Sequence, residues 1–198
     1  PSVACTSSAL PGSVLPTSHS VRLMNRRSAV IEMKDERRAM HEGYVFLDEK
    51  CMLLAGEILR ELAQYGRLQR DFLALHEAAA AALQAAVARH GLQGLQVYPP
   101  GEGAGATLSL RPAALMGVRL QTATLDPGRL AAEPALERSP EAEACRRAFV
   151  AVLQAAATLA ALSGNLERLS LEYRRSVRRA RALQDVMLPE LDHVIGDI

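Results

Sequence analysis

The strongest constraint on this chain is a heptad pattern in its last third. Small and apolar residues recur there at steps that alternate between three and four residues. They are Cys145, Ala148, Val152, Ala155, Leu159, Leu162, Leu166, Leu169, Tyr173, Ser176, Ala180, Leu183 and Met187. A period of 3.5 residues held over about six heptads predicts a left-handed coiled coil, and its seam requires a partner helix of comparable length.

A partner of that length is available in the first half of the chain, because no proline occurs between Pro16 and Pro99. We expect a flexible tail over residues 1–20, rich in Pro, Ser and Thr, followed by a long helix over residues 21–90. Its seam runs through Met33, Arg37, Met40, Tyr44, Leu47, Cys51, Leu54 and Ile58. The seam then slips by one residue and resumes through Leu62, Tyr65, Leu68, Phe72, Leu75, Ala79, Ala82 and Ala86. Arg89, His90 and Gly91 predict the helix end, because cations complement its negative end and Gly adopts the left-handed cap.

Residues 91–138 have a different pattern, with short strand-like segments separated by Pro and Gly. The segments are 95–98, 107–110 and 118–122, and they predict a small β-hairpin or a three-stranded unit followed by a loop. The second helix, residues 139–198, begins at Ser139-Pro140-Glu141, with Ser as the cap and Pro at the first helical position. Pro189 predicts a kink around residues 185–187. The predicted fold is all-α: a long antiparallel two-helix coiled coil with a small β-hairpin-containing insert at the turn.

Composition and charge exclude several classes of function. The net charge of +1 gives no strong field for nucleic acid, and there is no Trp to support a thick globular core. Cys5, Cys51 and Cys145 are far apart and predict free thiols in a reducing compartment. The longest apolar stretch, Phe149–Leu162, is 14 residues long and contains Gln154, so we expect no transmembrane helix. Residues 1–20 lack the basic and apolar regions of a signal peptide.

The sequence offers no pattern typical of a catalytic, cofactor or metal site. The Gly-rich segment 101–105 lacks the Gly-Lys-Ser/Thr ending of a phosphate-binding loop, so we interpret it as a turn. The five histidines show no paired metal-ligand spacing, and no Gly-x-Ser-x-Gly pattern occurs. We therefore expect a protein that is not an enzyme and binds no cofactor.

Three segments resemble the D subunit of the V-type and A-type rotary ATPases, the central rotor shaft. Leu15-Pro16-Thr17 followed by Val21-Arg22-Leu23 resembles the opening before the family's first long helix. The segment 42–50, Glu-Gly-Tyr-Val-Phe-Leu-Asp-Glu-Lys, resembles a second family segment. The most specific match is 178–191, with a basic pair, Ala-Leu, apolar residues, Pro189 and Leu191.

The resemblance implies a mechanical role without bond chemistry. In that family the two termini form a tip inside the catalytic head of A and B subunits, and the small F subunit of the rotor binds the side of the coiled coil. The other end engages a funnel-shaped subunit on the membrane rotor ring. The implied location is the cytoplasmic side of the membrane, peripheral, with no membrane insertion. The implied function is to couple ATP hydrolysis or synthesis to proton or sodium translocation.

Two groups of residues carry that role in this interpretation. The coiled-coil seam is represented by Met40, Leu47, Leu54, Ile58, Leu159, Leu162, Leu166, Leu169, Tyr173, Leu183 and Met187. The predicted contacts of the tip with the catalytic head are Arg174, Arg175, Arg178, Arg179, Arg181, Pro189, Leu191, Ile195 and Ile198. The arginines could meet acidic loops of the head, but a solvated helical face would have the same composition.

Two other functions stay open at this point. An autonomous coiled-coil adaptor or dimerisation scaffold would need no ATPase subunits and would form a stable homodimer. A nucleic-acid binder would need aromatic residues among the arginines or a strongly basic total, and the sequence has neither, so we expect no nucleic-acid partner.

Overall fold

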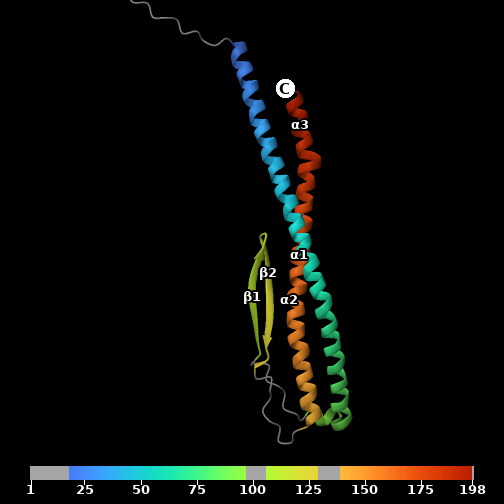
Figure 1. The fold of residues 1–198 in the computed structure, drawn as a ribbon. Coiled ribbons are helices and arrows are strands. Elements are labelled where there is room, and N and C mark those ends of the chain that lie inside the picture. Colours follow the sequence, from blue (N-terminus) through green and yellow to red (C-terminus); the bar gives the residue numbers. More distant parts are fainter. Residues whose placement is uncertain (1–17, 97–105, 129–138, 198) are drawn as a thin grey trace, which may run out of the picture. The chain divides into compact units, whose positions relative to one another are not determined.

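The computed structural model describes residues 18–96, 106–128 and 139–197, with side chains in the first range from residue 27 to residue 95. The elements in chain order are α1 (Ser18–Gln96), β1 (Thr107–Leu115), β2 (Val118–Asp126), α2 (Pro140–Ala182), a π-helical turn η3 (Leu183–Met187) and α3 (Leu188–Asp197) (Figure 1). The prediction of two long helices separated by a β-hairpin is confirmed. The chain divides into two compact units, Leu47–Arg179 and residues 1–46 with 180–198.

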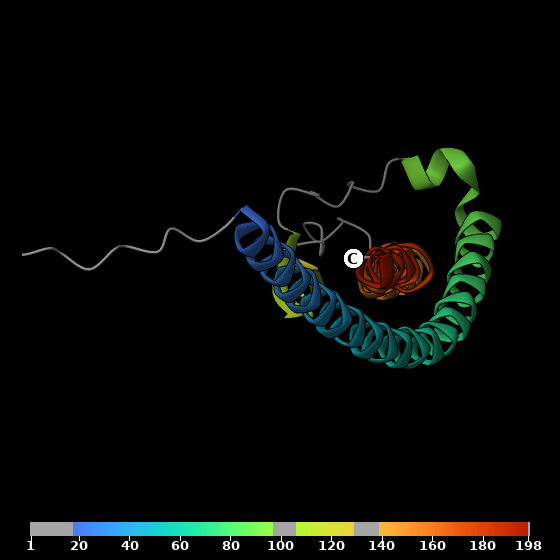
Figure 2. The same cartoon turned by 90° about the horizontal axis from the view of Figure 1, so that it is seen from above.

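In the larger unit the predicted seam of α2 is the protected side of the helix. None of the seam residues from Cys145 to Ser176 is exposed, and Val152, Leu162, Leu169 and Ser176 are buried. The teal-to-green part of α1 curves around α2 when viewed along the helices (Figure 2). This curvature is what a 3.5-residue repeat requires to keep its seam against the partner.

The predicted one-residue slip in the seam of α1 is wrong. Leu62 is 52% exposed, whereas Glu61 is partly buried. With Glu61 at the seam, the steps from Ile58 to Tyr65 are three and four, and the heptad continues without interruption. A carboxylate therefore occupies a seam position at which an apolar side chain is expected. The prediction chose the apolar neighbour Leu62 for this position, which shifted the predicted seam by one residue.

The hairpin β1–β2 packs its turn against the two helices. Leu54, Val118 and Leu169 form a buried cluster, and Leu54 and Leu169 have no exposed surface. Partly buried residues complete it: Ile58, Leu115, Met116, Leu120 and Tyr173. Because the cluster joins α1, α2 and the hairpin turn, the insert is fixed to the side of the coiled coil in this unit.

The hairpin is a two-stranded antiparallel sheet whose register pairs Leu115 with Val118. The two-residue turn, Met116 and Gly117, has positive φ at both positions, 47° and 82°. This is the combination of a type I′ turn, which matches the twist of the strands. A left-handed Met is unusual, and packing of Met116 against the buried cluster offsets its strain.

One edge of the hairpin is covered by polar side chains of α2. The Gln121 N–H donates to Asn165 Oδ1, and Asn165 Nδ2 donates to the Gln121 carbonyl, both at 2.9 Å. Longer bonds of 3.5 Å run from Thr158 Oγ1 to the Ala123 carbonyl and from Gln154 Nε2 to the Leu125 carbonyl. Asn165 thus satisfies the backbone N–H and carbonyl of Gln121, which would otherwise need a neighbouring strand. Strand β2 runs antiparallel to α2 (Figure 1).

Residues 92–96, which follow the main part of α1, are helical, whereas the sequence predicts a strand at 95–98. Gly91 has φ 65° and ψ 169°, which breaks the helix where the sequence predicts its end. Helical structure then resumes and includes Leu95 and Gln96, so these two residues are not in a strand; Val97 and Tyr98 lie outside the described residues. A short segment of alternating apolar residues is compatible with one further helical turn as well as with a strand. Its periodicity alone therefore does not distinguish the two.

In the smaller unit the predicted kink before Pro189 takes the form of the π-helical turn η3. The Leu188 N–H donates to the Leu183 carbonyl, five residues back. Pro189 has no N–H to give to the Asp185 carbonyl, and a π turn absorbs such a missing bond. The extra residue moves the seam: Leu188, Leu191 and Ile195 are partly buried, whereas Met187 is 39% exposed. The prediction that Met187 belongs to the seam is therefore wrong, because the heptad was counted through an insertion.

Candidate functional site

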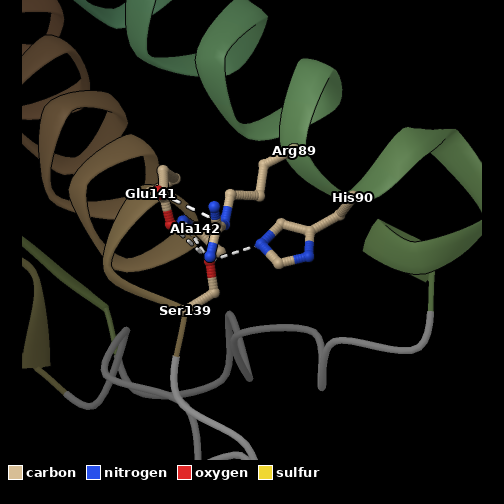
Figure 3. A network of polar contacts seen from close by, with 5 residues as sticks. All are labelled: Arg89, His90, Ser139, Glu141 and Ala142. Carbon is tan, nitrogen blue, oxygen red and sulfur yellow. Dashed lines mark hydrogen bonds and ion pairs between the residues drawn. The ribbon is translucent and has the colours of Figure 1, made fainter.

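A polar network joins the end of α1 to the start of α2 in the larger unit (Figure 3). His90 Nε2 lies 2.5 Å from Ser139 Oγ, and the Arg89 guanidinium lies 3.5 Å from the Glu141 carboxylate. Ser139 Oγ accepts the Ala142 N–H at 3.2 Å and donates to Glu141 Oε2 at 3.2 Å. The predicted Ser cap of the second helix is confirmed, and the same side chain also contacts His90, directly before the break of α1 at Gly91.

The hydroxyl of Ser139 lies within hydrogen-bond distance of both His90 and Glu141, and it also caps α2 by accepting the Ala142 N–H. The pKa of Glu141 is lowered, first by its own backbone N–H and further by Ser139, Arg89 and His90, while burial opposes the shift. The charged carboxylate at the positive end of α2 therefore acts as part of a helix cap.

A second link between the helices lies next to the buried cluster. Lys50 Nζ donates to Glu172 Oε1 at 2.6 Å, and both side chains are mostly buried. The bond to Lys50 lowers the pKa of Glu172, and the charges of Arg175 and Arg179 lower it further. A charge-assisted bond at this place fixes the axial register of α1 against α2, because sliding by one turn would leave both charges unpaired.

The five predicted contact arginines on α2 are all exposed. They are Arg174, Arg175, Arg178, Arg179 and Arg181. They alternate with the protected seam positions Ser176 and Ala180, so they form the outer face of the helix. Among the described residues none of the five forms an ion pair within 4 Å. The geometry leaves this face available to an acidic partner, and contact with such a partner stays a prediction.

The predicted tip residues occupy different environments on α3. Pro189 is exposed, whereas Leu191 and Ile195 are on the more protected side of the helix; Ile198 lies outside the described residues. Within the same unit the Asp192 carboxylate binds the Arg37 guanidinium, including a bond of 3.3 Å from Nη2 to Oδ2. Both side chains are about half exposed, so solvent screens this pair and its contribution to stability is small.

Across residues 18–96, 106–128 and 139–197, no group of three His, Cys, Asp or Glu side chains could hold a metal ion. Cys51 and Cys145 are free thiols, and burial raises the pKa of each. The helix from Pro140 to Asp197 contains a window apolar enough to cross a membrane by length and composition alone. That window is weak evidence for a membrane span, because a helix of a soluble coiled coil can pass the same test.

The sequence did not identify Glu61, Asn165 or the ion pair of Lys50 with Glu172. An unbroken heptad count through residue 61 was the available signal for Glu61. Asn165 lies directly before the seam residue Leu166, at a flanking position where a polar side chain can reach a third element. The partner of Lys50 lies 122 residues away and follows only from the alignment of the two helices.

Two comparisons with known proteins found matches that cover most of this chain. A family model for the D subunit of ATP synthase matches residues 29–198, which include most of α1, the hairpin and α2. The chain is also similar to a protein of Thermotoga neapolitana that is named as the D subunit of a V-type ATP synthase. The two are 23% identical over 172 residues, covering 85% of this chain and 84% of the relative.

Proposed function

We propose the function of a rotating shaft for this chain, which belongs to the D-subunit family of ATP synthases and so is a structural component of the central stalk of a rotary ATPase. In this proposal the chain couples ATP hydrolysis or synthesis in a catalytic hexamer of A and B subunits to proton or sodium translocation. It does no bond chemistry itself. It works from the cytoplasmic side of the membrane as a peripheral part of a membrane-bound complex.

The observation that carries the proposal is the pairing of two long seams within one chain. Torque can pass along such a pair only if its helices do not slide. In the larger unit, interdigitated side chains around Leu54 and Leu169, the ion pair of Lys50 with Glu172 and the Ser139 cap all oppose sliding. An asymmetric shaft then offers each catalytic interface a different surface, and differential contact energy biases each interface toward an open or closed state.

The partners follow the same proposal. The exposed arginine face of α2, together with Pro189, Leu191, Ile195 and Ile198, contacts the catalytic head. The small F subunit of the rotor binds the side of the coiled coil, and the funnel-shaped subunit links the shaft to the membrane ring. Long-range attraction between arginines and acidic loops suits a rotating contact, because it does not depend on one fixed geometry.

Intramolecular pairing also weighs against the alternative of a dimerisation scaffold. A homodimeric coiled coil would expose a long seam to a second copy, whereas here the seam of α2 from Cys145 to Ser176 is already protected within one chain. An isolated chain that is monomeric by light scattering is the expected result. A stable dimer with exchange of helices between copies would support the scaffold instead.

Reconstitution tests the proposed function. The purified chain, mixed with the catalytic A and B subunits, should co-elute with the hexamer and change its ATP turnover. The double variant Arg178→Gln with Arg181→Gln should bind more weakly, and the loss should be greatest at low salt. A matched double variant on an exposed part of α1, Arg67→Gln with Arg70→Gln, should bind normally. Failure of the unmodified chain to co-elute, with ATP turnover unchanged, would reject the proposal.

A further inference from the structure

A hollow of about 320 Å³ lies between the hairpin and α2. It is lined by Leu110, Pro112, Arg119, Leu120, Gln121 and Arg168. All of these residues belong to the larger unit, and Asn165 fixes the geometry by binding Gln121 on one side and Arg168 on the other. The hollow is therefore held by the same contact that attaches the hairpin to α2.

Two arginines, Arg119 and Arg168, line this hollow. Arg168 Nη2 donates to Asn165 Oδ1 at 2.7 Å, but its Nε is buried and has no hydrogen-bond partner. Arg119 forms no ion pair with the residues that the structure describes. Two like charges in one hollow repel each other. An anion placed between them would offset that repulsion.

The rest of the lining is apolar, which restricts the kind of anion. Leu110, Pro112 and Leu120 contribute hydrocarbon surface to the hollow. Leu108 lies two residues from Leu110 on the same face of β1, and both leucines are 53% exposed. The apolar surface therefore extends beyond the hollow itself. A small inorganic anion would leave this surface uncovered, whereas a carboxylate carried beside an apolar side chain would fill the hollow and cover the leucines.

The free edge of β1 does not offer an alternative way of binding. Gln121 directs its N–H and carbonyl toward α2, so its partner Pro112 occupies a position whose backbone faces the open edge. Pro112 has no N–H, and an added strand would lose a ladder bond in the middle of the edge. A partner that binds on this side of the hairpin must therefore contact the side chains of β1 and not its backbone edge.

We propose that this hollow is a docking site for a segment of a partner protein in which an acidic residue stands next to apolar residues. The carboxylate lies between Arg119 and Arg168, as a bidentate or bridging acceptor, and the apolar neighbours pack on Leu108 and Leu110. This site is separate from the arginine face of α2 and does not depend on the proposed contact with the catalytic head.

The test uses the full chain labelled with ¹⁵N-arginine, whose Nε–H signals are followed by NMR. The probe is acetyl-Leu-Glu-Leu-amide, with acetyl-Leu-Gln-Leu-amide and sodium acetate as comparison ligands at matched ionic strength. We expect saturable shifts of Arg119 and Arg168 with the acidic peptide. The Gln peptide should bind about tenfold more weakly, since its neutral amide makes weaker hydrogen bonds with the guanidinium groups than a carboxylate does.

Matched variants separate the site from general attraction to positive charge. Arg119→Gln should weaken binding of the acidic peptide about tenfold. Arg111→Gln removes the same charge from the other face of β1 and should leave binding unchanged. Absence of a saturable shift, equal binding of the Gln peptide, or an equal effect of the two variants would overturn the proposal. If acetate bound as tightly as the peptide, the site would be one for free anions and the docking proposal would also be wrong.

Discussion

Replacing Glu61 by Leu should stabilise this protein, although the change places a larger apolar residue on a highly charged helix. Glu61 stands at a seam position, and its Oε2 atom is buried without a hydrogen-bond partner. The pKa of Glu61 is raised, first by burial and then by the neighbouring carboxylate of Glu57, while Arg60 opposes the shift. Leu at this position would restore the apolar heptad and remove an uncompensated charge.

The magnitude follows from two contributions. Full burial of a Leu side chain contributes about 1.5–3 kcal/mol, and a partly buried position should give about half of that. Removing a buried acceptor without a partner relieves about 1–3 kcal/mol, again reduced by partial exposure. Together they predict about 2 kcal/mol for Glu61→Leu. In a chain of this size that gain corresponds to a rise in Tm of roughly 4–8 °C.

The gain should depend on pH. Between the ordinary pKa of 4.5 and the raised value in the folded protein, the folded state binds more protons than the unfolded state. The contribution of Glu61 to stability therefore increases as pH falls through this window and decreases as pH rises. The variant Glu61→Gln should be more stable than the unmodified chain at pH 7, and this advantage should shrink as the pH approaches 4.5.

Thermal unfolding followed by circular dichroism measures both effects. Glu77→Leu is the matched control, because Glu77 is exposed on the same helix and away from the seam. It should change the free energy of unfolding by less than about 0.5 kcal/mol. If Glu61→Leu were no more stabilising than Glu77→Leu, or if Leu62→Gln were as destabilising as a seam substitution, the seam register through Glu61 would be wrong.

Five other substitutions test the packing, the cap and the backbone by chemical denaturation. Leu169→Ala should cost about 2–5 kcal/mol because it opens a cavity in the buried cluster, whereas Leu171→Ala on the exposed side should cost less than about 1 kcal/mol; equal costs would contradict the assigned faces. Ser139→Ala should cost about 0.5–2 kcal/mol through loss of the helix cap, and no change would mean that the cap is dispensable. Gly66→Ala should stabilise by up to about 1 kcal/mol, since nothing lies within 4 Å of an added Cβ, whereas Gly91→Ala should destabilise because φ is 65°; the same sign for both would refute this.

Much of this fold follows from local rules. The seam of α2, the Ser139 cap, the break at Gly91 and the disturbance before Pro189 each depend on a few neighbouring residues, and the structure has all four. Such features are predictable because their physical causes lie within one or two helical turns.

The two errors in the seam have different causes. A preference for an apolar residue moved the predicted seam from Glu61 to Leu62, whereas a fixed 3.5-residue period carried it through the π turn to Met187. Packing against the rest of the protein accommodates a carboxylate at position 61. Before Pro189, which lacks a backbone N–H, the π turn adds one residue to the spacing between seam positions. A fixed 3.5-residue period keeps Glu61 at the seam, but it does not show the change in residue count before Pro189.

The attachment of the hairpin could not be predicted from the sequence. It depends on Asn165 recognising the backbone of Gln121 and on Met116 entering the buried cluster from a left-handed turn. Both contacts join segments that are far apart in the chain. The predicted contacts of the arginine face and of the tip depend on other subunits, so they remain predictions that only the assembled complex can test.

The most direct test of the shaft function is observation of rotation in single complexes. The catalytic hexamer is fixed to glass, and a bead is attached to this chain through Ser109→Cys on the exposed strand β1, with the native cysteines replaced by Ala. The account predicts that ATP drives the bead continuously in one direction. A bead that stays stationary while the same hexamers hydrolyse ATP would contradict it.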